Sequence, residues 1–431
     1  MKCFPRRRNF LIIKVKVKNS NNRYCESNKL NKMSTNTLPY AVLIDMDYLT
    51  GIQTSRILAA RGVPVIGLAK NPKHFCARTK TCERIIQTET KTYELIDKLI
   101  ELGKTLKQKA VLYPCQDTSV LLVSRYREKL TPYYHISLPD IETVELLMNK
   151  PCFYEFAQKE NLPVAKFFLI KNRNDAEEAA GTLAFPCVLK PHMKSPKWEE
   201  NTNLKAFKVL NEKELFELYD KIAGWSEVLM LQEWIEGTDT SLYSCNSYYN
   251  KNSESLADFT AKKLRQWPII TGNTSLGVDV IDETVLQVTT QLFKKVNYVG
   301  LGYVEIKKDV RNGNYYIIEP NIGRPTGRSA LAEACGVDLI YTMYCDCLGL
   351  PLPDTRKQTF KGVKWIHLRT DMQSAYNYWK TGNLTFKEWI KSVKGKKFYS
   401  VLSFKDPVPF LEEIRMGLVY SIKSLFKRIN K

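Results

Sequence analysis

Hydrophobic residues fall into short runs separated by helical patterns near the start of the chain. Residues 41–46 (AVLIDM) form an apolar run with the length of a buried strand, and a turn containing Gly51 follows it. A helical pattern then ends at Gly62, and residues 63–69 (VPVIGLA) form a second apolar run. Strand, helix and strand in this order predict the start of a doubly wound parallel sheet.

The same alternation continues for one more unit. A helical pattern at about 92–107 precedes a third apolar run at 110–114, with Gln116 and Asp117 at its carboxyl end. We therefore predict a Rossmann-like domain over residues 38–140. The first turn lacks G-x-G-x-x-G, so a dinucleotide site is not expected in this domain.

Two further segments mix strands and helices in an α+β pattern. Residues 141–237 contain helical patterns and apolar runs, with a polar loop after Lys190. Residues 238–370 are predicted to hold strands at 240–247, 256–263, 301–307 and 314–319, with a helix at 284–297. The predicted fold class is thus an α/β domain followed by two α+β lobes.

The C-terminal extension, residues 371–431, ends in a pattern typical of a basic amphipathic helix. Within 410–431, apolar residues recur at three- and four-residue spacing and basic residues lie between them. The apolar set is Leu411, Ile414, Leu418, Ile422, Leu425 and Ile429, and the basic set is Arg415, Lys423, Lys427, Arg428 and Lys431. Two interpretations stay open: a helix docked on the body, or peripheral contact with an anionic membrane surface.

The net charge of +20 lies mostly at the two ends of the chain. Residues 1–33 carry ten Lys or Arg and one Glu, and residues 385–431 carry eleven basic and four acidic residues. The part between them has a net charge of only +4, so a basic nucleic-acid-binding body is not expected. Residues 1–37 are interpreted as a disordered basic extension, and Met33 is an alternative to Met1 as the start.

The cysteine pattern argues against a zinc protein. The eleven cysteines include no C-x-x-C pair, and the four histidines lie in no ligand or nucleophile pattern. Reduced thiols in a cytoplasmic protein are therefore expected, with the inner face of the membrane as a peripheral alternative. No apolar run reaches the about 18 residues that a membrane span requires.

The most informative stretch is GLGYVEIKKDVRNGNYYIIEPNIGRPTGRS, residues 300–329. Two alternating strands are joined by a turn at Asn312-Gly313, and Glu319 and Asn321 share a face of the second strand. Glu305, on the first strand, can face them across the hairpin. Three hard oxygen ligands on one face suit Mg²⁺, whereas the simpler interpretation is a surface hairpin with scattered charges. Arg324 and Arg328 follow and could hold a carboxylate or a phosphate.

Two upstream features have the chemistry of a nucleotide site. Lys190 lies near the end of the apolar run FPCVLKP, so a charged side chain follows a segment that is expected to be a buried strand. The run LMLQEWIEGTD offers an exposed strand edge near Gln232, Glu233 and Ile235 that could bind an adenine ring. The acid Asp239 lies four residues beyond Ile235 and could bind a ribose.

In sequence order these features resemble the ATP-grasp superfamily, over roughly residues 40–350. The resemblance implies a pre-ATP-grasp Rossmann-like domain and two lobes that hold ATP and Mg²⁺ between them, Mn²⁺ being an alternative metal. It implies that Lys150 and Lys190 contact the phosphates, and that Gln232, Glu233 and Ile235 line the adenine pocket. Asp239 would bind the ribose, and the metal ligands would be Glu305, Glu319 and Asn321.

Within the superfamily, the chain resembles the carboxylate–amine ligase branch, which includes carbamoyl-phosphate-synthase-type domains and D-aspartate ligases. The motifs that carry this likeness are EPNIGRPTGRSALAEACGVDL, DYLTG and KKLRQWP. The resemblance implies an acylphosphate intermediate that an amine then displaces. Arg324, Arg328 and Arg265 are candidates to bind the substrate carboxylate, and Lys263 is predicted to share a strand face with Arg265.

One departure concerns the loop that covers the phosphates, which is usually rich in glycine in this family. Between Gly181 and Gly224 the chain has no glycine. Lys205, or else Lys208, lies where a loop lysine could reach a phosphate. We therefore predict a ligase for a small-molecule carboxylate and amine, with an amino acid or a cell-envelope or polysaccharide precursor as the substrate class. A non-catalytic ATP-binding scaffold is the alternative, and a nucleotide-sugar or NAD enzyme is not supported.

Overall fold

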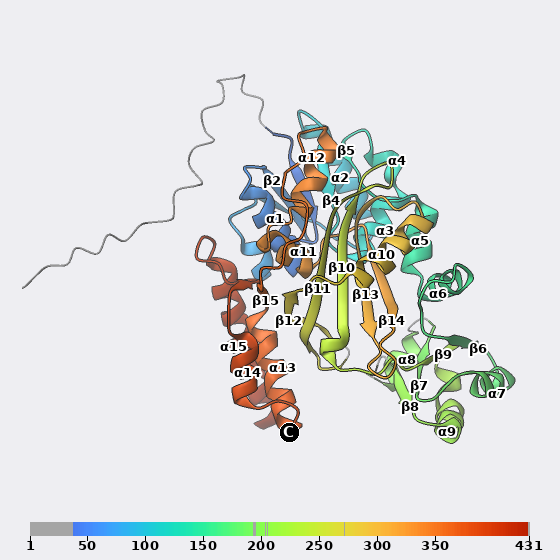
Figure 1. Ribbon diagram of the computed structural model, residues 1–431. Coiled ribbons are helices and arrows are strands. Elements are labelled where there is room, and N and C mark those ends of the chain that lie inside the picture. Colours follow the sequence, from blue (N-terminus) through green and yellow to red (C-terminus); the bar gives the residue numbers. More distant parts are fainter. Residues whose placement is uncertain (1–37, 193–194, 203, 205, 271, 430–431) are drawn as a thin grey trace, which may run out of the picture. The chain divides into compact units, whose positions relative to one another are not determined.

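The computed structural model describes residues 38–429 apart from 193–194, 203, 205 and 271, and it describes side chains as far as Val419 (Figure 1). The predicted basic extension 1–37 and the predicted loop lysine Lys205 lie outside the described residues. No helix in the described part of the chain combines the length and the apolar character needed to cross a membrane.

The first sheet is the parallel one that the strand–helix alternation predicts. Its order is β3-β2-β1-β4-β5, and every pair of neighbours is parallel. The strands are β1 (Ala41–Ile44), β2 (Val65–Ala69), β3 (Arg84–Gln87), β4 (Ala110–Tyr113) and β5 (Tyr134–His135). The accompanying helices are α1 (Leu49–Ala59), α2 (Glu94–Thr105), α3 (Asp117–Arg125) and α4 (Arg127–Leu130).

The strand order reverses between β1 and β4, and this determines where the sheet can bind a ligand. In an open parallel sheet, the carboxyl ends of the strands at such a reversal form a crevice. The segment Tyr48–Thr50 follows β1 there, and Gln116 and Asp117 follow β4. Gly51 sits where an added Cβ would lie 2.8 Å from the carbonyl oxygen of Asp45, so α1 can begin this close to β1 only with glycine.

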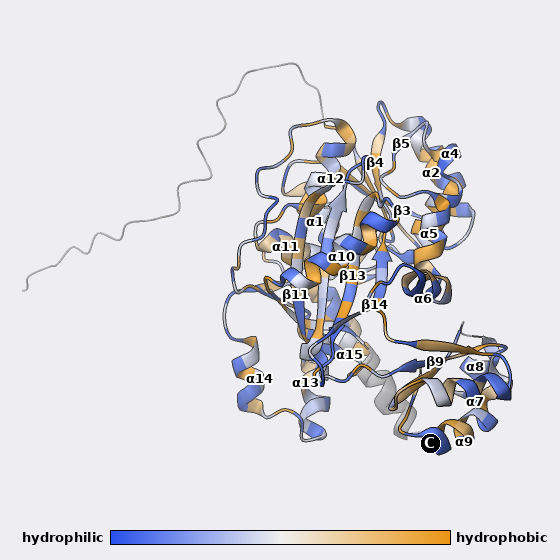
Figure 2. Ribbon diagram, turned by 45° about the vertical axis from the view of Figure 1, so that its right-hand side comes forward, coloured by the Kyte–Doolittle hydropathy of each residue, from blue (hydrophilic) through white to orange (hydrophobic). Residues whose placement is uncertain are grey.

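The second sheet has four antiparallel strands in the order β6-β9-β7-β8. These are β6 (Phe167–Ile170), β7 (Cys187–Pro191), β8 (Phe207–Val209) and β9 (Leu229–Glu233). Helices α7 (Arg173–Thr182) and α9 (Glu212–Ile222) pack on the sheet and carry both hydrophobic and hydrophilic residues (Figure 2). The segment predicted as a polar loop contains α8 (Pro196–Asn201) and β8, held by the buried indole of Trp198.

The third sheet is the largest, with the order β14-β13-β10-β11-β12-β15-β16. Its strands are β10 (Leu242–Tyr249), β11 (Ser255–Trp267), β12 (Asn273–Asp279), β13 (Gly300–Lys308), β14 (Tyr315–Ile322), β15 (Lys364–Ile366) and β16 (Lys397–Tyr399). The four predicted strands and the predicted helix, α10 (Glu283–Lys295), are present within a few residues. The sheet continues through β16, past the predicted boundary at residue 370, and the domain boundaries themselves stay predictions.

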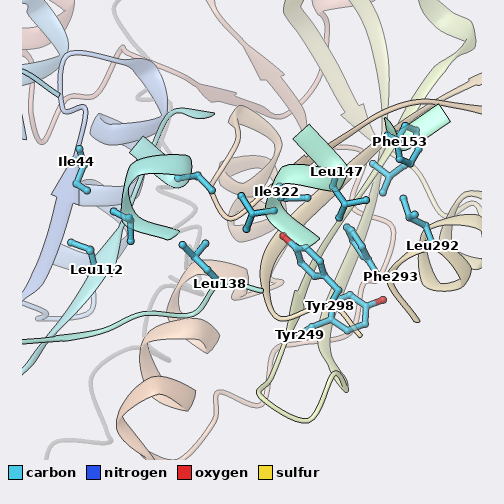
Figure 3. Close-up of a cluster of buried hydrophobic side chains, with 14 of the residues drawn as sticks. Ile44, Leu112, Leu138, Leu147, Phe153, Tyr249, Leu292, Phe293, Tyr298 and Ile322 are labelled. Atoms are coloured by element: carbon cyan, nitrogen blue, oxygen red, sulfur yellow. The ribbon is translucent and has the colours of Figure 1, made fainter. Parts of the chain in front are cut away.

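One continuous hydrophobic core joins the parallel sheet to the large sheet (Figure 3). Ile44 and Leu112 come from β1 and β4, whereas Tyr249 and Ile322 come from β10 and β14. Phe293 of α10 stacks on Tyr298 with ring centroids 4.1 Å apart, in the same cluster. Helices α5 (Ile141–Met148) and α6 (Lys150–Lys159) contribute Leu147 and Phe153 to it, and so connect this core to the start of the small sheet.

The remaining helices follow β14. They are α11 (Gly327–Ala334), α12 (Leu339–Leu348), α13 (Leu368–Lys380), α14 (Phe386–Val393) and α15 (Val408–Ile429). Three short 3₁₀ helices lie earlier in the chain: η1 (Phe75–Arg78), η2 (Ala223–Trp225) and η3 (Asp239–Ser241). The predicted C-terminal amphipathic helix corresponds to α15, which contacts η1. Glu413 of α15 is buried and hydrogen-bonded to His367.

Candidate active site

Two carboxylates meet on the hairpin formed by β13 and β14. Glu305 lies directly opposite Glu319 in the register of the two strands, and Asn321 lies two residues beyond Glu319. The Glu305 carboxylate accepts hydrogen bonds from the Tyr303 hydroxyl at 2.6 Å and from Lys263 Nζ at 3.0 Å. Because facing residues of an antiparallel pair project to one side, the hairpin places Glu305, Glu319 and Asn321 together; their role as metal ligands stays a prediction.

Cations surround both carboxylates. Arg328 lies 3.5 Å from Glu305, and Lys150 lies 2.8 Å from Glu319. Burial opposes ionisation of Glu305, but the charges of Lys263 and Arg328 outweigh burial and lower the pKa of this carboxyl to about 2. Glu305 is therefore ionised at neutral pH although its side chain is only 14% exposed.

The donor set fits Mg²⁺ shared with phosphates. The described residues hold no cluster of three or more His, Cys, Asp or Glu side chains, so they offer no all-protein metal cage. Two carboxylates and one amide are nevertheless the number and kind of ligands that Mg²⁺ uses beside phosphate oxygens. The Asn321 Oδ1 accepts from Arg324 at 2.7 Å, while its buried Nδ2 has no hydrogen bond to any described residue. The two ends of this amide can exchange by a flip, which would present the oxygen instead.

Two lysines approach the same site from other elements. Lys150 is the first residue of α6, where the Asn149 side chain caps the helix and Pro151 follows. Lys190 emerges from β7 and donates to Gln232 Oε1 at 2.8 Å. Burial, aided by the nearby charge of Lys150, lowers the pKa of Lys190 to about 8.

A cavity of about 760 Å³ joins these groups to an apolar wall. The wall is built around the end of β9 from Val188, Ile235, Leu242 and Ile318, with Gln232, Glu233 and Trp234 beside them. Gln232 is buried, and Glu233 accepts a hydrogen bond from the amide of Ala184 at 3.0 Å. Apolar surface with a few convergent polar groups is the usual lining of a small-molecule site.

The cavity lining also includes the two predicted arginines. Arg324 pairs with Asp117, at the start of α3 in the parallel-sheet domain. The Arg328 guanidinium lies over the Tyr303 ring at 4.7 Å and bonds to Thr274. Both arginines line the cavity, so the site presents fixed cations next to the carboxylate pair.

Known proteins of similar sequence and structure were then compared with this chain, and no family model matches it. A D-aspartate ligase from Enterococcus faecium is 27% identical over 237 residues, which cover 52% of this chain and 55% of that protein. A formate-dependent phosphoribosylglycinamide formyltransferase from Saccharolobus solfataricus is 24% identical over 312 residues, 68% of this chain and 73% of that protein. The match thus spans about half the length of the first relative.

The structural likeness extends over more of the chain. The crystal structure of an N5-carboxyaminoimidazole synthetase from Staphylococcus aureus, in complex with ADP, covers 77% of this chain and 81% of its own, with a TM-score of 0.59 and 17% identity. Together these comparisons support the resemblance to the ATP-grasp superfamily, and the solved neighbour shares the fold of this chain. The predicted ATP-grasp fold, with a parallel-sheet domain before the two lobes, is confirmed.

Most of the predicted ATP-grasp residues line the one cavity. They are Lys150, Lys190, Gln232, Glu233, Ile235, Lys263, Glu305, Glu319, Asn321, Arg324 and Arg328. Asp239 is not among the lining residues: it is buried and accepts hydrogen bonds from Gln266 and from the Tyr378 hydroxyl. Its predicted ribose contact stays a prediction, whereas its observed partner Gln266 does line the cavity.

The prediction that Lys263 and Arg265 share a face is wrong. The register of β11 against β12 shifts on either side of Arg265, which marks a β-bulge, so the two-residue alternation is broken there. Lys263 and Gln266 therefore line the cavity, while Arg265 points elsewhere and is buried. Arg265 forms a bidentate pair with Asp371 at 2.8 and 2.9 Å and bonds Ser392, so it joins β11 to α13 and α14.

Several lining residues of this ATP-grasp site were not assigned from sequence. Tyr303 and Gln266 contact the predicted Glu305 and Lys263, and Trp365 of β15 lines the cavity with them. The parallel-sheet domain adds Tyr48–Thr50 and Asp117. The sequence did contain a signal for Tyr48–Thr50 and Asp117. Each follows a strand next to the point where the strand order of a parallel sheet reverses, and ligand sites form there.

Proposed function

We propose that the protein is an ATP- and Mg²⁺-dependent ligase that joins a carboxylate to an amine. The observation that carries this proposal is the convergence in one cavity of the Glu305–Glu319 pair, the two lysines and the two arginines. Lys190 comes from the small sheet and the two carboxylates come from the large sheet, whereas Lys150 lies on α6 and Arg328 on α11. A site that requires so many distant elements to meet is unlike a surface hairpin with scattered charges.

ATP would lie between the small sheet and the large sheet. The base would pack on the apolar wall near Gln232 and Ile235, and the phosphates would reach Lys150 and Lys190. Glu305, Glu319 and Asn321 would hold Mg²⁺, which would offset phosphate charge during transfer. The solved neighbour with bound ADP supports nucleotide binding by this fold.

The chemistry would proceed in two displacements. A substrate carboxylate oxygen would attack the γ-phosphorus of ATP, forming a P–O bond while the bond to the ADP oxygen breaks. The amine nitrogen would then attack the acyl carbon, forming the C–N bond, releasing inorganic phosphate and losing a proton. Arg328 and Arg324 would hold the anionic carboxylate, and the fixed charges would stabilise the developing phosphoryl charge without reorganisation.

An amino acid is the substrate class that the relatives favour. One relative is named D-aspartate ligase, and another, a D-alanine–D-alanine ligase from Acinetobacter baylyi, is 24% identical over 42% of this chain and 60% of that protein. Both names describe ligation of amino acids. The paired Arg324 and Asp117 offer one cation and one anion at the cavity, which suits a molecule carrying both charges.

The test is phosphate release from ATP and Mg²⁺ in the presence of pooled amino acids and other small carboxylates, with and without pooled amines. Release that depends on the added carboxylates or amino acids and disappears in Arg328→Met supports the ligase. ATP binding with no release under any pool would support the scaffold alternative instead. Absence of ATP binding by calorimetry would exclude both functions.

A further inference from the structure

The last helix, α15, presents an apolar stripe to solvent. Leu411, Ile414 and Leu418 are 60%, 45% and 60% exposed. Their spacing of three and four residues places them on one face of the helix. The sequence continues the same spacing with Ile422, Leu425 and Ile429 up to the end of the helix.

The other face of α15 holds the helix to the body, so the stripe cannot simply turn inward. Glu413 is buried, with its Oε1 2.7 Å from His367 Nε2 and 3.0 Å from Arg369 Nε. Phe410 packs against a small core cluster that includes Ile52 and Phe75. Rotating the helix to bury the stripe would separate the buried Glu413 carboxylate from its partners His367 and Arg369.

Other segments of the C-terminal extension also expose apolar and basic residues. Phe404, in the turn before α15, is 94% exposed and is followed by the exposed Lys405. On α14, Phe386 and Ile390 are exposed four residues apart, and hydrophobic and hydrophilic residues alternate along this helix (Figure 2). Residues 385–431 contain eleven basic and four acidic residues, so this part of the sequence carries a net positive charge. Exposed apolar surface of this extent marks an interaction site.

We propose that this surface, formed by Phe404 and the stripe on α15, binds a membrane with anionic headgroups. An amphipathic helix lying parallel to a bilayer buries its apolar face at the headgroup boundary, while lysines and arginines such as Lys405 and Arg415 contact the lipid phosphates. A second copy of the chain fits the surface less well, because it would bring the same excess of positive charge to the contact. The proposal is independent of the ligase chemistry.

The test is co-sedimentation of the full chain with vesicles of phosphatidylcholine alone and of phosphatidylcholine mixed with phosphatidylglycerol. We expect binding to the anionic vesicles, weakened by salt. The triple variant Leu411→Ser/Ile414→Ser/Leu418→Ser should reduce the partition coefficient at least about tenfold, because it removes the apolar insertion. The matched control is Ile281→Ser/Val310→Ser, which alters two aliphatic residues of similar exposure (55% and 62%) elsewhere and should bind like the unmodified chain.

Three results would overturn the proposal. One is equal sedimentation with and without anionic lipid, and another is equal binding by the triple variant and the unmodified chain. The third is a dimer in light scattering without lipid that the triple variant abolishes, which would assign the stripe to a second copy. Thermal unfolding of each variant shows whether it is folded, and a folded Phe404→Ser variant with weakened binding provides a second, milder confirmation.

Discussion

Glu305 and Glu319 face each other across β13 and β14, and each carboxylate has its own lysine. Lys263 comes from β11, which is separated from β13 by β10 in the same sheet, and Lys150 comes from helix α6. Two carboxylates held this close repel one another unless cations compensate them. The lysines supply that compensation, and a divalent cation with its phosphates could take it over.

Replacing Glu319 should remove the dependence of nucleotide binding on magnesium. In Glu319→Ala we expect ATP to bind equally with and without Mg²⁺, because one of two carboxylate ligands is missing. Turnover should fall by about 100-fold or more, since the metal and the fixed charges stabilise the transferring phosphoryl group. Calorimetric titration of ATP with and without Mg²⁺ measures the first effect. The exposed Glu227→Ala serves as the control, and a persisting metal effect in Glu319→Ala would contradict the assignment.

Lys190 should make ATP binding depend on pH. Its pKa is lowered to about 8 by burial and by Lys150, and only the charged ammonium attracts phosphate. The affinity for ATP should therefore be full below pH 7 and weaken as the pH rises through about 8. Lys190→Arg keeps its charge over this range and should show a flatter profile. Dissociation constants measured from about pH 6.5 to about pH 9 decide this, because that range spans the titration of Lys190. Identical profiles for the two proteins would refute the prediction.

The sequence is sufficient for the parallel sheet and for the metal hairpin because both rest on local patterns. Apolar runs alternating with helices predict β1, β2 and β4, and residues two apart on a strand must share a face. The facing of Glu305 and Glu319 needs only the hairpin turn in addition. These elements depend on residues that are near one another in the chain.

What could not be predicted depends on contacts between distant residues. The bulge in β11 arises from its pairing with β12, and no local signal shows that Arg265 will turn away toward Asp371. Asp239 has the carboxylate expected of a residue that binds a ribose, yet in the structure this carboxylate accepts hydrogen bonds from Gln266 and Tyr378. Tyr378 is 139 residues away in the sequence. A prediction of strand faces from a two-residue period fails wherever such a bulge inserts a residue.

Arg265 should affect stability and Arg328 should affect activity. The Arg265–Asp371 pair is almost fully buried, with side chains 5% and 1% exposed. Arg265→Met leaves Asp371 buried without its partner, so we expect the free energy of unfolding to fall by about 3–5 kcal/mol. The double variant Arg265→Met/Asp371→Leu should recover much of this loss.

Urea unfolding of these variants and of Arg328→Met separates the two roles. Arg328→Met should reduce substrate-dependent phosphate release far more than it reduces stability, since its guanidinium lines the cavity. A folded Arg265→Met protein of unchanged stability that loses only substrate dependence would restore the substrate-binding role first predicted for Arg265.

Glu413 should anchor α15 in a manner that depends on pH. Burial raises the pKa of its carboxyl, but hydrogen bonds and charges from His367 and Arg369 outweigh burial, so the pKa in the folded protein is lowered. A carboxyl whose folded pKa lies below its unfolded value, about 4.3, contributes stability above that value and loses it as the pH falls through the folded pKa. Glu413→Gln should therefore lower the free energy of unfolding by about 1–3 kcal/mol at pH 7. That difference should shrink as the pH falls below about 4.

Urea midpoints at several pH values measure the effect of Glu413→Gln, with the exposed Glu217→Gln on α9 as control. A loss of stability that is equal at pH 7 and at low pH would show that the charge of Glu413 does not hold the helix.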